Sequence, residues 1–196
     1  MIITDATAAD APLIADAVIE AIGPEIADGL AGKTHSRADV HALFTALAAR
    51  PDTQYSFANT RIARSEASGA PMGVCVSYDG ELLLTLRRAF FREAALRLGW
   101  TLTPEEAEAI HPETGPEEFY LDTLMTLPAH RGQGVGRALI MDAKLKARAA
   151  GKPLGLLCDT DNDRARSLYD SLGFRPAGTR PFAGHVMNRL ILPSDC

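Results

Sequence analysis

The sequence predicts one α/β domain of the α+β type, and three observations support this prediction. With 196 residues, the chain is long enough to bury a substantial core within a single domain. Segments with the period of a strand alternate with segments that have the period of a helix. Neither an internal repeat nor a low-complexity linker divides the sequence. We therefore treat residues 1–196 as one domain.

The first part of the chain is predicted to form a strand, two helices and then two strands. Ser36 with Asp39 is typical of a helix start in which side chains cap the first turn. Gly23-Pro24 is expected to end the first helix, because proline cannot continue a helical run. The expected ranges are 1–5 for the first strand, 7–23 and 36–50 for the helices, and 55–64 and 72–78 for the other two strands.

The second part is predicted to contain further helices and four strands. Thr103-Pro104-Glu105-Glu106 is typical of the start of a short helix, since proline suits the first helical position. A polar loop follows at 111–116. Strands are expected at 119–127, 154–158, 174–177 and 186–192, and helices at 82–98, at 134–150 and from Asp161 or Asn162 to Gly173.

Composition and charge exclude several classes of protein. A formal net charge of −5 argues against general nucleic-acid binding, which depends on Lys and Arg. Cys75, Cys158 and Cys196 are an odd, scattered set that indicates reduced thiols and a cytoplasmic protein, and the sequence has no Cys/His cluster typical of a metal site. It also has no leader-like segment and no apolar run of membrane-spanning length, so we expect no membrane partner.

A glycine-rich turn stands between a predicted strand and a predicted helix. Its residues are Arg131-Gly132-Gln133-Gly134-Val135-Gly136. A helix start has unpaired N–H groups and the positive end of the helix dipole, so it binds phosphate readily. Glycines allow a pyrophosphate to approach the backbone. Six Lys or Arg residues accompany a single acid between His130 and Lys152, which adds a local positive field.

Two common phosphate motifs can be tested against this turn. A dinucleotide fingerprint requires G-x-G-x-x-G, but its third glycine would fall on Arg137 or Leu139. A Walker A loop requires Gly-Lys-Ser/Thr, which the sequence does not contain. The turn therefore indicates a different phosphate-bearing ligand, and a nucleotide-binding oxidoreductase or kinase is disfavoured.

A second motif follows the strand at 154–158. Asn162, Ala165 and Tyr169 are spaced three and four residues apart and so share one face of a helix. Ala165 would let a ligand come close, Asn162 could bind its amides, and Tyr169 could donate a proton. Taken singly, Asn162 is also a common helix cap and Tyr169 a common core residue.

Together the two motifs resemble those of the GNAT superfamily of acyl-CoA-dependent N-acetyltransferases. The family pattern Arg/Gln-x-x-Gly-x-Gly/Ala matches Arg131, Gly134 and Gly136, and Asn-x-x-Ala-x-x-x-Tyr followed by Gly-Phe matches the second motif. The resemblance implies a mixed, mostly antiparallel sheet of six to seven strands, with splayed fourth and fifth strands and flanking helices. Residues 81–118 exceed the usual link between the third and fourth strands, so we interpret them as a helical insertion near the acceptor site.

The resemblance also implies how acetyl-CoA would bind as the cosubstrate. Pantetheine would pair with the backbone of Leu124, Met125 and Thr126. The pyrophosphate would lie on the N–H groups of the turn, and Asn162 would contact the pantetheine arm close to Ala165. The residues implicated in the turn are Arg131, Gly132, Gln133, Gly134, Val135, Gly136 and Arg137.

The implied chemistry is direct attack of a primary amine on the thioester. An ammonium of pKa about 10 must first lose a proton, so a base or a water relay is needed. Many family members carry a glutamate base where this chain has Tyr120; strand alternation puts Asp122 and then Glu118 on the same face, and we rank them in that order. Tyr169 matches the family's general acid, and the backbone N–H of Leu124 or Met125 is the expected oxyanion donor.

Other functional assignments remain open at this stage. Cys158 is interpreted as buried packing, because direct transfer needs no acyl-enzyme. The acceptor could be a small molecule or a peptide amine, and the resemblance implies a tendency to form homodimers. The alternative function is a non-catalytic domain that binds acyl-CoA as a sensor.

Overall fold

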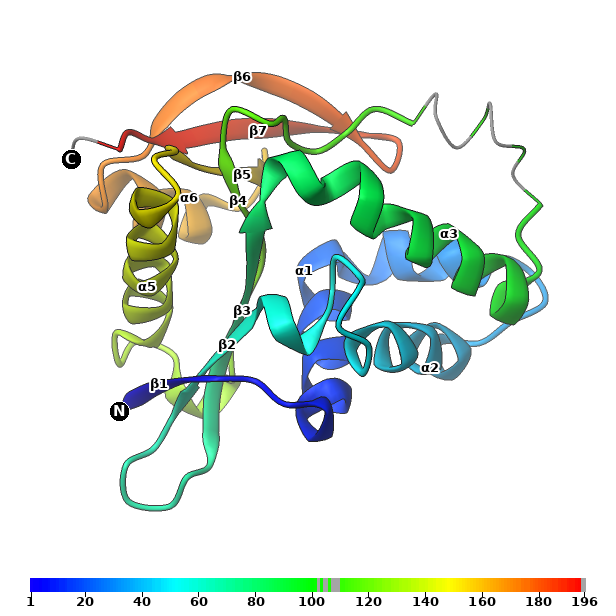
Figure 1. The fold of residues 1–196 in the computed structure, drawn as a ribbon, viewed down its shortest axis with the longest axis horizontal. Helices are drawn as coiled ribbons and strands as arrows, with labels where there is room; N and C mark the ends of the chain where they lie inside the picture. Colours follow the sequence, from blue (N-terminus) through cyan, green and yellow to red (C-terminus); the bar gives the residue numbers. More distant parts are fainter. Residues whose placement is uncertain (102, 104–105, 107–109, 195–196) are drawn as a thin grey trace.

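The computed structural model describes residues 1–101, 103, 106 and 110–194. A seven-stranded sheet in the order β1-β2-β3-β4-β5-β7-β6 forms its centre (Figure 1). β4 and β5 are parallel, and the other neighbouring pairs are antiparallel, which confirms the mixed, mostly antiparallel sheet that the resemblance implied. The strands are β1 (Ile2–Asp5), β2 (Thr60–Arg64), β3 (Pro71–Asp79), β4 (Phe119–Thr126), β5 (Leu154–Asp159), β6 (Arg175–Phe182) and β7 (His185–Leu192).

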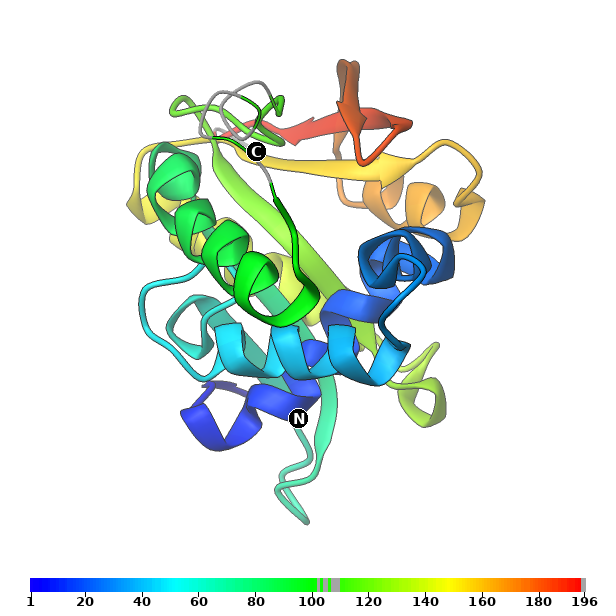
Figure 2. The same cartoon turned by 90° about the vertical axis from the view of Figure 1, so that its right-hand side faces the viewer.

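Helices cover both faces of this sheet. α5 and α6 lie on one face and α1, α2 and α3 on the other, and Figure 2 shows α2 and α3 in front of the sheet. The apolar core follows the same division, with one cluster under α1 to α3 and a second under α5 and α6. The helices are α1 (Ala11–Ala31), α2 (Arg37–Ala48), α3 (Leu83–Leu98), α5 (Val135–Ala149) and α6 (Asp163–Ser171). Among the described helices, none is both long enough and apolar enough to cross a membrane.

The predicted helix starts are confirmed by their caps. Ser36 and Asp39 form a reciprocal capping box before α2. Gly134 caps α5 in a left-handed conformation, with φ of 80°. The side chain of Asn162 caps α6 by accepting from the N–H of Ala165. These local signals fix where the helices of the two motifs begin.

Three elements differ from the prediction. α1 does not end at Gly23-Pro24: Gly23 is non-helical, with φ of 78°, but Pro24 starts a second helical stretch that continues the element. Residues 57–59 form a 3-10 helix instead of a strand, because Ser56 caps the N–H of Ala58. β6 is longer than expected, since a hairpin with positive φ at Ala183 and Gly184 pairs it with β7.

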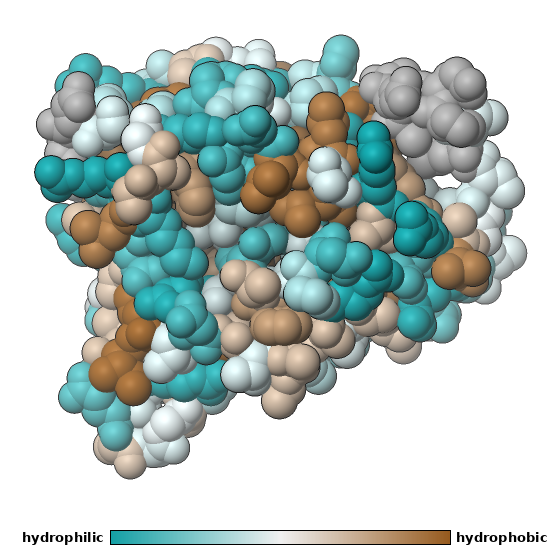
Figure 3. Space-filling model, in the orientation of Figure 1, coloured by the Kyte–Doolittle hydropathy of each residue, from teal (hydrophilic) through white to brown (hydrophobic). Residues whose placement is uncertain are grey.

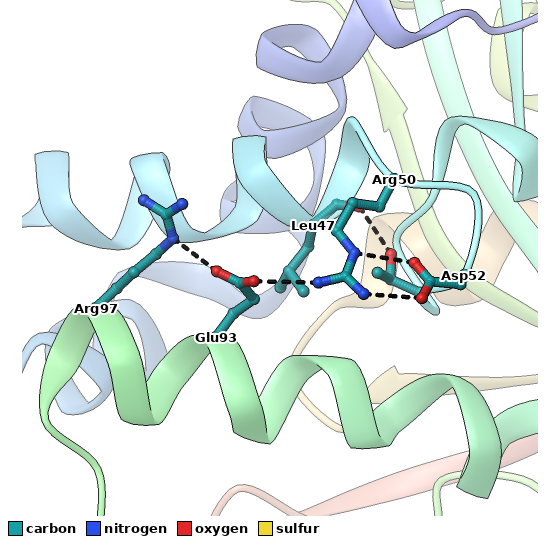
Figure 4. A network of polar contacts seen from close by, with 6 residues as sticks. Leu47, Arg50, Asp52, Glu93 and Arg97 are labelled. Atoms are coloured by element: carbon teal, nitrogen blue, oxygen red, sulfur yellow. Dashed lines mark hydrogen bonds and ion pairs between the residues drawn. The ribbon is translucent and has the colours of Figure 1, made fainter.

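The segment between β3 and β4 contains the predicted helix as α3. The proposed start at Thr103-Pro104-Glu105-Glu106 lies partly outside the described residues, although Thr103 and Glu106 exchange capping hydrogen bonds. Polar contacts fasten α3 to the end of α2 (Figure 4). Arg50 binds Glu93 at 3.1 Å, and Glu93 also accepts from Arg97 at 2.9 Å.

Candidate active site

β4 and β5 diverge soon after they begin to pair. Their register consists of Phe119 opposite Leu154 and Tyr120 opposite Gly155, although β4 has eight residues and β5 has six. Beyond these pairs the strands enclose a cleft of about 380 Å³. Its walls come from α1, β4, β5, α6 and the β6–β7 hairpin. The splay implied by the sequence therefore creates the central hollow of the molecule.

The glycine turn opens onto a second hollow, of about 490 Å³, at the start of α5. Gly132 and Gly134 have φ of 76° and 80°, and a Cβ built on either would meet no described atom within 4 Å. The N-terminus of a 15-residue helix points its N–H groups here. Predicted residues that line the hollow are Thr126, Arg131, Gly132, Gly134, Val135, Gly136, Arg137, Asn162 and Ala165.

Two charged residues of this hollow were missed by sequence reasoning. Arg164 lies in the first turn of α6 and adds a third cation to Arg131 and Arg137. Glu20 comes from α1 and binds Nη2 of Arg131 at 2.5 Å. The position of Arg164 beside Asn162 could have indicated its role, whereas Glu20 is 111 residues from its partner and offers no local signal.

Side-chain hydrogen bonds hold the turn in place. The side chain of Gln133 donates to the carbonyl of Ala129 at 3.0 Å, which closes the turn. Nε of Arg131 donates to the carbonyl of Thr126 at 3.2 Å and joins the turn to the end of β4. The side chain of Met125 is buried in the core under α1 to α3, so a ligand in the cleft could use only its backbone. Two side-chain hydrogen bonds therefore fasten the turn to its neighbours.

Gly134→Ala is expected to lower stability by about 1 kcal/mol, because alanine is strained at positive φ. It should also weaken acetyl-CoA binding, since the start of α5 must shift. Denaturant unfolding and thermal-shift titration with acetyl-CoA measure the two effects. Gly136→Ala is the matched control: its Cβ would meet Thr126 and Leu168 at ordinary contact distances of 3.4 and 3.5 Å. Equal acetyl-CoA affinity in the two variants would contradict the assignment.

Tyr169 lines the cleft from α6. Its side chain is 7% exposed, and its ring contacts Phe174 at a centroid distance of 5.4 Å. Burial raises the pKa of Tyr169 above its usual value, so the phenol keeps its proton at neutral pH. Asn162 and Ala165 line the same cleft from the same helix. The face of α6 predicted from the spacing is therefore the face that borders the hollow.

Asp122 lies across the cleft on β4, at a β-bulge. Leu121 pairs with Ser77 and Thr123 with Val76, so Asp122 is the extra residue between them. The hydroxyl of Tyr78 donates to its Oδ2 at 2.6 Å, and that of Thr123 to its Oδ1 at 3.0 Å. Burial, which disfavours the charged form, raises the pKa of Asp122 to about 7, although the hydrogen bond from Tyr78 opposes this shift. Such a carboxylate accepts a proton near neutral pH.

Glu118, the second candidate base, is held in other contacts. Its carboxylate accepts from Thr114 Oγ1 at 2.8 Å and from Arg189 Nη2 at 2.9 Å. The side chain of Glu118 is 2% exposed, and a Cβ on Gly155 would lie 2.2 Å from its Oε2. Glu118 and Asp122 therefore have different hydrogen-bond partners, although both side chains belong to the same stretch of chain. Glu118 links the start of β4 to β7 through Arg189.

Glu118→Gln is expected to destabilise the fold by about 3 kcal/mol, since it removes the counter-charge of Arg189. This loss of stability is at the low end of the range for breaking a buried ion pair, because Glu117 also lies 3.8 Å from the guanidinium of Arg189. Urea unfolding measures the effect. Glu117→Gln is the matched control and should change stability by less than about 1 kcal/mol, because Glu117 is 59% exposed. Two equal losses would refute a structural role specific to Glu118.

Two of the predicted thiols are buried. The pKa values of Cys75 and Cys158 are raised by burial, which favours the inert thiol form. Cys158 forms part of the cleft wall but is 4% exposed. Cys196 lies outside the described residues. The two described cysteines fit the interpretation of packing.

Comparisons with known proteins agree with this geometry. The model of the acetyltransferase (GNAT) family matches residues 44–174. The chain is 37% identical over 84 residues to the N-alpha-acetyltransferase RimI of Mycobacterium tuberculosis, covering 43% of this chain and 52% of RimI. It spans only 18% to 52% of the length of the curated relatives that it matches.

Solved structures are similar along nearly the whole chain. An acetyltransferase crystal structure is 28% identical with a TM-score of 0.73, and 98% of each chain is covered. An N-acetyltransferase from Staphylococcus aureus Mu50 has the same fold, with a TM-score of 0.76, 21% identity, and coverage of 98% of this chain and 100% of that one. The two solved structures therefore share the fold of this chain. The chain belongs to the acetyltransferase (GNAT) family.

Proposed function

We propose that the chain is an N-acetyltransferase that moves the acetyl group of acetyl-CoA directly to a primary amine in a ternary complex. The observation that carries this proposal is that Asp122 and Tyr169 line one cleft of about 380 Å³, Asp122 from β4 and Tyr169 from α6. Asp122 is suited to accept a proton near pH 7, and the phenol of Tyr169 still carries its proton at that pH. The phosphate hollow shares Asn162 and Ala165 with this cleft.

The donor side fits a pyrophosphate-bearing ligand. Arg131, Arg137 and Arg164 supply positive charge around the helix start, and glycines at positive φ keep the backbone accessible. The N–H groups of residues 133–137 would hold the pyrophosphate, and the backbone of residues 124–126 would pair with the pantetheine amides. When bound, acetyl-CoA supplies an acetyl thioester as the acyl donor.

The side chains of the cleft would then move two protons. Asp122 takes a proton from the incoming ammonium, which frees the nitrogen lone pair. A C–N bond would form and the C–S bond would break, with Tyr169 giving its proton to the departing sulfur. The second proton, which the acylated nitrogen sheds to become an amide, would restore the phenol of Tyr169 through water. The backbone N–H of Leu124 or Met125 stabilises the negative charge on the acyl oxygen. Tyr78 positions Asp122 through their 2.6 Å hydrogen bond.

The acceptor is a primary amine of a small molecule or a peptide. RimI is named an N-alpha-acetyltransferase, which places a peptide N-terminus among the candidates. The carboxylate of Asp122, which lines the cleft, favours a cationic acceptor. The alternative function, a sensor that binds acyl-CoA without turnover, would have no use for a base and an acid in one cleft.

The test combines binding and turnover. In a thermal-shift comparison, acetyl-CoA should raise the melting temperature more than ATP or NADH at equal concentration. Thiol release from acetyl-CoA should then depend on an added amine. Binding without amine-dependent thiol release across peptide, polyamine, amino-sugar and aromatic amines would favour the sensor. Absence of acetyl-CoA binding would overturn both readings.

A further inference from the structure

The acceptor end of the cleft leads to an apolar pocket of about 250 Å³ between α1, α3 and the β6–β7 hairpin. Ile22, Ile26 and Leu30 recur every four residues and form one wall from the second half of α1. Phe90 and Phe91 of α3 face them. The other apolar residues of the lining are Phe44, Tyr55, Trp100, Ile110, Pro181, Phe182 and Ala183.

This pocket is a built cavity. Arg87 of α3 donates to the carbonyl of Ile110 at 3.0 Å and pairs with Glu113 at 3.3 Å, which holds residues 110–113 against the helix. Trp100 Nε1 donates to the carbonyl of Leu30 at 3.3 Å and joins the end of α3 to α1. The contact between Glu93 and Arg50 fixes the other side of α3 to α2 (Figure 4). The walls are therefore tied together by directed polar contacts.

A smaller hollow, which we call the neck, lies between the pocket and the reaction cleft. It has a volume of about 60 Å³ and is lined by Tyr55, Glu113, Tyr120 and Asp122. Ile22 and Phe182 both line the pocket, the neck and the cleft, so these three hollows adjoin. Apolar walls stand at one end of this path, and the carboxylate of Asp122 stands at the other.

One polar atom in the pocket lacks a partner. Gln54 is 2% exposed, and its Oε1 is among the buried side-chain atoms of the described residues that have no hydrogen-bond partner. Gln54 belongs to the pocket lining. An unsatisfied buried acceptor is costly unless a ligand N–H completes it. Its placement points to a bound nitrogen-bearing molecule.

We propose that the acceptor is a free primary amine that carries an aromatic group on a short, unbranched carbon chain. This inference rests on the proposed N-acetyltransferase function. A cavity of about 150 Å³ holds benzene, so 250 Å³ accommodates a phenyl or indole ring. The narrow neck fits an unbranched stem better than a peptide backbone. Asp122, which lines both the neck and the cleft, then receives the ammonium.

Amine selectivity provides the first arm of the experiment. With acetyl-CoA saturating, 2-phenylethylamine and tryptamine should exceed n-propylamine and ethanolamine in kcat/KM by about 10- to 100-fold, because a ring leaves water for the pocket. Peptides that begin with Phe or Ser test the other source of the same amine chemistry. A Phe peptide that outperforms 2-phenylethylamine, or equal kcat/KM for all the amines, would overturn the proposal.

Trp100 provides a readout that does not require turnover. It is the single tryptophan of the chain and lines the pocket, so its fluorescence should change when 2-phenylethylamine binds, with or without CoA. Fluorescence change without thiol release would mean that the pocket assignment holds and the proposed activity fails. Thiol release with ethanolamine and no fluorescence change with the aromatic amines would mean the reverse.

Variants on opposite walls locate the binding site. Phe91→Ala should raise KM for 2-phenylethylamine about 10-fold by removing an aromatic wall. Ile26→Phe should also raise this KM, by filling the pocket from α1. Leu84→Ala is the matched control on α3, because Leu84 is 58% exposed and is not part of the pocket lining. Figure 3 shows hydrophobic surface over the first turns of α3. If the control shifts the amine ratio as much as the pocket variants, the assignment is wrong.

Discussion

Tyr169→Phe is expected to lower kcat by about 100-fold while the KM for acetyl-CoA stays unchanged. The variant keeps the ring that packs on Phe174 and loses only the hydroxyl, so the cleft wall is preserved. The departing thiolate then has no positioned proton donor, which slows the step in which the C–S bond breaks. Steady-state thiol release measures kcat, and thermal shift with acetyl-CoA reports whether donor binding survives.

A hydroxyl elsewhere on α6 provides the matched control. Ser167 is exposed, and its hydroxyl donates to the carbonyl of Asp163 within the helix. Ser167→Ala should therefore retain full turnover. If Tyr169→Phe also keeps full turnover with unchanged acetyl-CoA affinity, Tyr169 is not the acid, and water must protonate the sulfur.

Asp122→Asn is expected to reduce kcat/KM for the amine by at least about 100-fold at pH 7, because asparagine cannot accept the ammonium proton. In the wild type, kcat/KM should rise with pH through an apparent pKa near 7, the value that burial gives to Asp122. The variant should lose this limb of the profile. A pH–rate profile measured for both proteins with one amine checks the assignment.

Stability separates loss of the base from damage to the fold. The folded pKa of Asp122, about 7, lies above the ordinary value of 3.8 for this carboxyl, so protonation favours the folded state. The stability that this provides is complete below about pH 4 and is lost as the pH rises through 7. Asparagine has no charge to bury and still accepts from Tyr78, so the variant should melt no lower than the wild type at pH 8. If the variant melts at a lower temperature than the wild type at pH 8, its loss of activity is explained by damage to the fold.

Much of the donor site could be predicted from sequence because its signals are local. The turn from Arg131 to Gly136 and the Asn162 cap are stretches in which residue type dictates backbone conformation directly. The strands around them followed from period and turn chemistry. The mixed, mostly antiparallel sheet with splayed fourth and fifth strands then followed from resemblance to one family.

The acceptor site could not be predicted because it is assembled across the chain. Ile26 and Leu30 lie beyond Gly23, which was expected to end α1, and a pattern in which proline terminates a helix does not predict that the helix resumes at Pro24. The bulge at Asp122 also defeats strand alternation, which would have grouped it with Glu118. Such features depend on packing between elements, which no local pattern records.

The short pairing of β4 and β5 has a mechanical consequence. The ladder of hydrogen bonds barely connects the two halves of the sheet, so apolar side chains must hold them together. Leu139 and Ile140 of α5 share one core with Leu121 of β4 and Leu156 of β5, and so bridge the gap from behind. The width of the cleft is consequently set by a helix face that no substrate touches. Trimming a methyl group there would alter the clamp on the acyl donor without changing any residue that binds it.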